Sequence, residues 1–259
     1  MAELPGLETS GAREIADHLK TITGGTVLDV ATGKGNFIET LMKTLKTYDS
    51  FVGVDIDQDD LAHARKRFQN QTISFLEMNA TQLDFEDEFF DTVSIANSLH
   101  HLENVPAVLA EIKRVLTPGG HFIVSEMYQD GAQSEAQHTD ILEHHWTAKI
   151  DRLKGLTHHE TLFRRSIVAE LEALHFTDLV LLDSSRYVKC LFCEDRFGCE
   201  NPKSASMIAS FIKGVDKTLQ SLEPHKRTPE LLTEAEALKV RVKETGIANA
   251  SIVFAIGTK

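Results

Sequence analysis

An acidic residue at the end of an apolar run, followed by a glycine-containing loop, is the feature of this sequence best suited to ligand chemistry. Apart from Asp29 the run 27–30 is apolar, and the loop 31–35 after it is Ala-Thr-Gly-Lys-Gly. Glycines let a backbone approach a ligand closely. A second acid, Asp55, ends another apolar run about twenty residues on, the spacing at which a carboxylate reaches ribose hydroxyls. These residues predict a cradle for a ribose-containing ligand.

The loop lacks features of two phosphate-binding patterns. A dinucleotide fingerprint needs a third glycine three positions after Gly35, where the chain has Ile38. A P-loop needs Ser or Thr after Gly-Lys, and Lys34 is followed by Gly35. What remains is a ligand with a ribose and an adenine but little negative charge. S-adenosylmethionine fits this description, because its sulfonium and ammonium groups are cationic and it carries no phosphate.

The elements around the loop alternate regularly. After a first helix that ends near Lys20, the periodicity predicts strands near 26–30, 50–54, 72–76, 90–96 and 120–126, separated by helices near 35–46, 58–69 and 104–115. Two later strands are expected at 179–182 and 250–256. The pattern predicts an α/β fold with a doubly wound, seven-stranded, mostly parallel sheet.

The loop after Asp29 resembles motif I of the class I S-adenosylmethionine-dependent methyltransferases. The segment 90–97 resembles motif IV, the segment 115–124 resembles the turn into the fifth strand, and the likeness covers roughly the first 127 residues and the last strand. The resemblance implies S-adenosyl-L-methionine as cofactor. It also implies direct in-line transfer of a methyl group to an acceptor, without a covalent enzyme intermediate.

The resemblance also implies which residues bind the cofactor. Asp29 and the loop hold its amino acid end, Asp55 binds the ribose, and the strand that ends at Asn97 faces the methionine portion. The implied cofactor-binding residues are Asp29, Ala31, Thr32, Gly33, Gly35, Asp55, Ile56, Asn79, Ala80 and Asn97.

Three of these positions carry an open question. Ala31 stands where the family has a glycine, and Asn79, expected with the Ala80 amide at the adenine, stands where the family has an acid. Asn is also a common turn residue. For Asp55 the alternative is a structural one, because Asp55 or Asp57 could cap the helix that follows.

Two histidines directly follow motif IV. Many small-molecule members of the family carry a stretch similar to Leu99-His100-His101-Leu102 below the transferable methyl group. The resemblance makes His100 the candidate general base. In the alternative interpretation one of these histidines caps or packs on the helix that begins near Val105.

Two insertions interrupt the core pattern. We expect a cofactor-binding core at 1–127, a helical cap insertion at 128–162, continued core at 163–183, a helical insertion at 184–247 and the last core strand at 248–259. The helices expected in and between the insertions are 129–153, 164–174, 203–221 and 229–245. Insertions at the carboxyl ends of strands select substrates in open α/β sheets.

The first insertion is rich in histidine, and its candidate acceptor-binding residues are Tyr128, His144, His145 and Arg152. On a helix, His144 and His145 point in different directions. The histidines could be solvated or hydrogen-bonded, or they could bind the acceptor or remove its proton. A metal site is not expected, because the helix offers no His-x3-His face.

The three cysteines, Cys190, Cys193 and Cys199, fall within ten residues of the second insertion. A structural zinc site needs a fourth ligand, and the sequence has no second Cys-x2-Cys. Three reduced thiols are therefore expected. The alternative is a metal or metalloid thiolate site, in a non-catalytic sensor that binds S-adenosylmethionine.

Composition limits the partners. The formal net charge of -12 argues against a nucleic-acid substrate, which would need clustered Lys and Arg, so the acceptor is expected to be a small molecule. The sequence shows no apolar run of membrane length and no signal-peptide pattern, which predicts a cytoplasmic protein without a membrane partner. No pattern indicates the oligomeric state.

Overall fold

A computed structural model describes residues 11–69, 72–184 and 201–259 of the chain. It divides into two compact units, which are described separately. The α/β unit contains residues 12–126, 165–183 and 253–259. Of the described residues, the helical unit contains 11, 127–164, 184 and 201–252.

The α/β unit is built on a seven-stranded sheet with the order β3-β2-β1-β4-β5-β7-β6. The strands are β1 (Thr26–Val30), β2 (Ser50–Asp55), β3 (Ile73–Glu77), β4 (Phe90–Ala96), β5 (Leu116–Met127), β6 (Thr177–Ser184) and β7 (Ile252–Thr258). β1 to β5 pair in parallel. The predicted doubly wound, mostly parallel sheet is confirmed.

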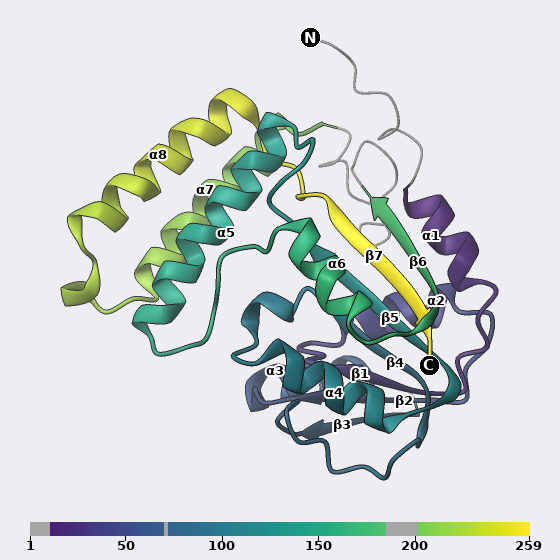
Figure 1. Ribbon diagram of the computed structural model, residues 1–259. Helices are drawn as coiled ribbons and strands as arrows, with labels where there is room; N and C mark the ends of the chain where they lie inside the picture. The colour runs from purple at the N-terminus through teal and green to yellow at the C-terminus, as the bar shows by residue number, and fades with distance from the viewer. Residues whose placement is uncertain (1–10, 70–71, 185–200) are drawn as a thin grey trace. The chain divides into compact units, whose positions relative to one another are not determined.

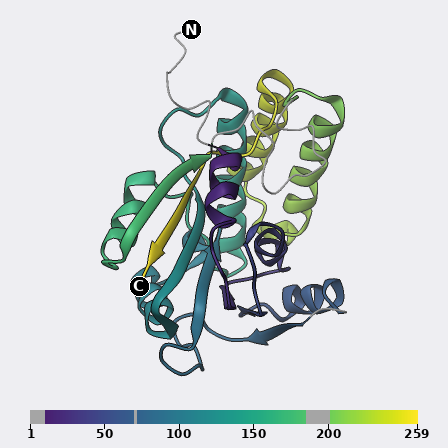
Figure 2. The same ribbon diagram turned by 90° about the vertical axis from the view of Figure 1, so that its right-hand side faces the viewer.

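The last strand runs against its neighbours. Gly119 donates its N–H to the Lys259 carbonyl, and Lys259 donates to the Gly120 carbonyl, which pairs the start of β5 with the end of the chain. In Figure 1 and Figure 2, β6 and β7 lie side by side with their arrows in opposite directions. β7 is therefore antiparallel within an otherwise parallel sheet.

The helices of the α/β unit lie in the crossovers between strands. They are α1 (Ala12–Leu19), α2 (Asn36–Thr44), α3 (Gln58–Arg67), the 3₁₀ turn η1 (Leu99–His101), α4 (Val105–Val115) and α6 (Arg164–Glu172). Each longer helix overlaps a predicted one. The core is apolar on both sides of the central strands, as in a sheet covered on both faces: Val27 and Leu28, which point to opposite faces of β1, are both fully buried.

The helical unit contains α5 (Glu135–Leu153), α7 (Ala205–Gln220), the 3₁₀ turn η2 (Pro224–Lys226) and α8 (Pro229–Thr245). Its core surrounds Trp146, which packs with Ile150, Leu231 and neighbouring apolar residues. The Trp146 indole N–H donates to the Leu231 carbonyl at 3.1 Å, so the ring's one polar group is satisfied.

The prediction that the long helix begins near Gln129 is wrong, since α5 begins at Glu135. Ser134 accepts a hydrogen bond from the Gln137 N–H, and the Gln137 side chain accepts one from the Ser134 N–H. This capping box satisfies N–H groups that the first helical turn leaves without partners. Residues 129–134 therefore form a loop before the helix.

Among the residues that the structure describes, no helix combines the length and the apolar character needed to cross a membrane.

Candidate active site

The loop between β1 and α2 has an unusual backbone. Ala31, Gly33 and Gly35 all have positive φ angles, of 53°, 51° and 75°. A methyl group added at Gly35 would lie 2.7 Å from the Phe68 ring, whereas one added at Gly33 would meet nothing closer than 3.6 Å. Gly35 is thus needed for both packing and conformation. Gly33 is needed for conformation, and a Cβ there would make only an ordinary contact with Asp60.

Hydrogen bonds to the end of β2 hold this loop. Thr32 donates its N–H to the Val54 carbonyl at 2.9 Å, and Gly33 donates its N–H to Oδ2 of Asp55 at 2.7 Å. The N–H of Gly35 bonds within the loop, to the Thr32 carbonyl. The two motif segments are therefore tied together directly.

Asp29 is buried beneath the loop. Its two carboxylate oxygens accept hydrogen bonds from the hydroxyls of Thr32, at 2.6 Å, and Ser94, at 2.7 Å. Burial raises the pKa of Asp29 to about 6, although these two hydrogen bonds act to lower it. In this structure Asp29 braces the carboxyl ends of β1 and β4, and its contact with a cofactor stays a prediction.

Asp55, the last residue of β2, and Asp57, just after it, have separate structural roles. Asp57 caps α3, because its side chain accepts the N–H groups of Asp59 and Asp60. The carboxylate of Asp55 instead holds the N–H groups of Gly33 and Asp57. The residue between them, Ile56, is 71% exposed. An apolar side chain exposed beside a carboxylate suits a ligand with a sugar and an aromatic base.

Asn79 forms a local turn after β3. Its side-chain oxygen accepts hydrogen bonds from both the N–H and the hydroxyl of Thr81, each at 2.9 Å. This is the turn role that the sequence left open. Contact of Asn79 and Ala80 with an adenine stays a prediction, and the oxygen proposed for that contact already has two donors here.

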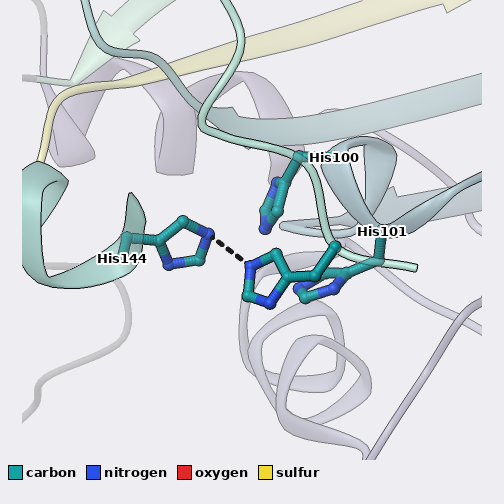
Figure 3. A group of neighbouring side chains, drawn as sticks. His100, His101 and His144 are labelled. Carbon is teal, nitrogen blue, oxygen red and sulfur yellow. Dashed lines mark hydrogen bonds between the residues drawn. The ribbon is translucent and has the colours of Figure 1, made fainter. Parts of the chain in front are cut away.

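At the end of β4 the chain turns sharply and carries two histidine rings. Asn97 has a positive φ of 46° and donates its N–H to the Ser125 carbonyl. His100 and His101 follow on η1, with ring centroids 4.3 Å apart (Figure 3). Asn104 caps α4 through its side-chain oxygen, so capping of that helix by a histidine is wrong.

A buried carboxylate, Glu126 at the end of β5, organises this turn. Its Oε1 lies 2.6 Å from Nδ1 of His100, and both side chains are buried. Its Oε2 accepts the N–H groups of Ser98 and Leu99, at 3.0 and 2.8 Å. Glu126 is not among the site residues predicted from the sequence. The available signal was an acid at the carboxyl end of a predicted buried strand.

In the helical unit, the candidate acceptor residues are dispersed. His144 bonds to His158, whereas His145 points elsewhere, with Nδ1 4.0 Å from the Glu160 carboxylate. Burial lowers the pKa of His145. Arg152 donates to the His158 carbonyl at 2.6 Å.

Tyr128 is buried, and its backbone bonds to Ser251 and Gln133. Acceptor binding by Tyr128 and the other three residues of that set stays a prediction. The three cysteines considered as possible metal ligands, Cys190, Cys193 and Cys199, lie outside the described residues.

The α/β unit thus brings candidate cofactor-binding residues together at the carboxyl ends of β1, β2 and β4. The seven-stranded sheet with an antiparallel β7 is the class I methyltransferase fold. A putative methyltransferase from Bacillus halodurans shares it with a TM-score of 0.57 and 18% identity, over 96% of this chain and 98% of that one.

Residues 28–124 match the family described as a methyltransferase domain. A demethylmenaquinone methyltransferase of Bacteroides fragilis is 29% identical over 126 residues, 47% of this chain and 51% of that protein. A ubiquinone/menaquinone biosynthesis C-methyltransferase of Desulfotalea psychrophila is 37% identical over 99 residues, 38% of this chain and 40% of that protein.

Over residues 28–124 the chain is thus similar to the class I S-adenosylmethionine-dependent methyltransferases, whose cofactor is S-adenosyl-L-methionine. The matches span about half or less of the length of these two curated relatives.

Proposed function

We propose that this protein transfers a methyl group from S-adenosyl-L-methionine to a small-molecule acceptor. The observation that carries the proposal is the loop 31–35, in which Ala31, Gly33 and Gly35 have left-handed backbones and the N–H of Gly33 is held by the carboxylate of Asp55. The relatives named above, whose names concern quinones, support an acceptor of small size. The net charge of -12 supports an acceptor other than a nucleic acid, which would need clustered Lys and Arg.

The residues present fit the cofactor. Asp55 offers a partly buried carboxylate for ribose hydroxyls, and Ile56 offers an exposed apolar surface for the adenine. Asp29 keeps the loop in place from below. When bound, S-adenosylmethionine supplies an electrophilic methyl group on a positively charged sulfur. The protein's part is to orient the two reactants and exclude water.

His100 is the proposed base for acceptors that must lose a proton. Because the Glu126 carboxylate holds Nδ1 of His100 at 2.6 Å, a proton taken up by this ring would go to Nε2. Glu126 also stabilises the positive charge that the ring then acquires. An acceptor that is already anionic needs no base, and His100 would then only shape the site.

Calorimetric titration with S-adenosylmethionine and S-adenosylhomocysteine tests the cofactor site. We expect Asp55→Asn to weaken binding tenfold to a hundredfold, because a hydrogen bond to a charged group contributes about 1.5–3 kcal/mol. Asp59→Ala is the matched control, since it removes an exposed acid nearby. The absence of binding heat with the unaltered protein would contradict the proposal, and equal affinity of Asp55→Asn would contradict the ribose assignment.

The acceptor class is tested with S-adenosylmethionine that carries a labelled methyl group. Separate incubations would contain a small-molecule cell extract, transfer RNA, or denatured protein. We expect a labelled methylated product only in the incubation with the small-molecule extract. Unlabelled S-adenosylhomocysteine should form alongside it. Label in the RNA or protein would contradict the proposed acceptor class, while leaving methyl transfer itself intact.

A further inference from the structure

Two histidine rings meet in the helical unit. Nε2 of His144, on α5, lies 3.0 Å from Nε2 of His158, in the segment after that helix. The ring centroids are 4.8 Å apart and the ring planes are inclined by 71°. His158 is only 3% exposed. The two nitrogens therefore face one another in a protected place.

A glycine turn brings His158 back along α5. Gly155 has a φ of 88°, Leu156 donates its N–H to the Asp151 carbonyl, and Gly155 donates to the Arg152 carbonyl. These bonds form a Schellman motif, in which a left-handed glycine ends the helix and reverses the chain. The Arg152 side chain then holds the His158 carbonyl.

Asp151 fixes the protonation of the His158 ring. Its Oδ2 lies 2.8 Å from Nδ1 of His158. Lys154 also donates to the Asp151 carboxylate, at 3.2 Å. An ionised carboxylate only accepts hydrogen bonds, so Nδ1 of His158 carries a hydrogen. In the neutral ring, Nε2 then presents its lone pair towards His144.

We propose that His144 and His158 are ligands of a divalent transition-metal ion of the zinc type, with Asp151 as the residue that orients His158. A carboxylate on the far nitrogen of a histidine is the usual partner of a metal-bound imidazole. Two ligand nitrogens at about 2.05 Å from a tetrahedral zinc ion lie about 3.3 Å apart. The observed 3.0 Å is close to this separation, and rotation of the rings would turn both lone pairs towards the ion in place of the hydrogen bond between them.

The ligand nitrogens decide which ion the site prefers. Half-buried Glu143 adds a second carboxylate that interacts electrostatically with His158 and Asp151. Lys154 bonds to Asp151 and Arg152 donates to the His158 carbonyl, so these surrounding charges balance. Imidazole ligands suit zinc, iron, nickel and copper, whereas magnesium and calcium prefer oxygen. Water or a polar atom of a small molecule would fill the other coordination positions.

The test uses the full chain with Cys190→Ser, Cys193→Ser and Cys199→Ser, so that thiolates contribute no metal binding. Zn²⁺ affinity is measured by competition with a chromophoric chelator, and Co²⁺ provides visible bands of a nitrogen and oxygen ligand set. We expect one ion per chain. Asp151→Asn should weaken binding tenfold to a hundredfold, and His144→Ala and His158→Ala at least as much.

His138→Ala on the same helix and His159→Ala beside His158 are matched controls, which should keep the affinity. Because His158 is buried, circular dichroism first checks that each variant folds, and half-buried His144 gives a second variant should His158→Ala fail. Absence of stoichiometric Zn²⁺ in the unaltered cysteine-free protein would overturn the proposal, as would equal losses in the controls. Neither result depends on whether the protein transfers methyl groups.

Discussion

At the scale of single residues, the most informative group is the buried carboxylate of Asp29. Its pKa is raised to about 6, above the ordinary value of 3.8, so the folded protein binds a proton there more tightly than the unfolded chain does. The stability that this group contributes is therefore fully present below about pH 4 and lost as the pH rises through about 6.

We expect Asp29→Asn to remove this part of the pH dependence. As the pH rises from 4 to 7, the free energy of unfolding of the variant should increase by up to about 3 kcal/mol relative to that of the unaltered protein. One pKa unit corresponds to about 1.4 kcal/mol. Urea titrations across this range measure the difference, with Asp49→Asn as an exposed control. Parallel pH curves for Asp29→Asn and the unaltered protein would contradict the pKa assignment.

At the scale of elements, the end of α5 depends on one glycine. Gly155→Ala should lower the free energy of unfolding by about 1 kcal/mol, because a left-handed conformation is costly for a residue with a Cβ. A Cβ at Gly155 meets nothing within 4 Å, so packing does not contribute. Thermal unfolding of the variant measures the effect.

Gly214 is the matched control for this prediction. It lies inside α7, has no positive φ, and also has open space where a methyl group would be added. Gly214→Ala should raise stability by roughly 0.5–1 kcal/mol, because alanine favours a helix interior. The same sign of change at both glycines would argue against the Schellman turn.

At the scale of the whole molecule, three strands connect the units covalently, because β5, β6 and β7 each cross the unit boundary near one end. We therefore expect one cooperative unfolding transition. Trp146, the one tryptophan of the sequence, is in the core of the helical unit and reports on it alone. Its fluorescence and the far-ultraviolet ellipticity should give the same urea midpoint.

Added S-adenosylhomocysteine, which we place in the α/β unit, should then shift both signals together. At a hundred times its dissociation constant the ligand should add about 2.7 kcal/mol. A shift in ellipticity without a matching shift in fluorescence would show that the units unfold separately.

Local pattern was enough to predict every strand of the sheet and the order of the methyltransferase motifs. Alternation and helical spacing involve neighbouring residues, and the acid-and-glycine loop after β1 is continuous in the chain. The sequence left open whether Asp55 or Asp57 caps the helix after β2, because either side chain is chemically able to cap it.

Pairings between distant segments came only from the tertiary structure. Glu126 meets His100 because β4 and β5 are parallel neighbours that end at the same edge of the sheet. His144 meets His158 because a glycine turn folds the chain back over α5. A buried polar side chain needs a hydrogen-bond partner. Which partner it has depends on which distant segment the fold places beside it, and no local spacing encodes that.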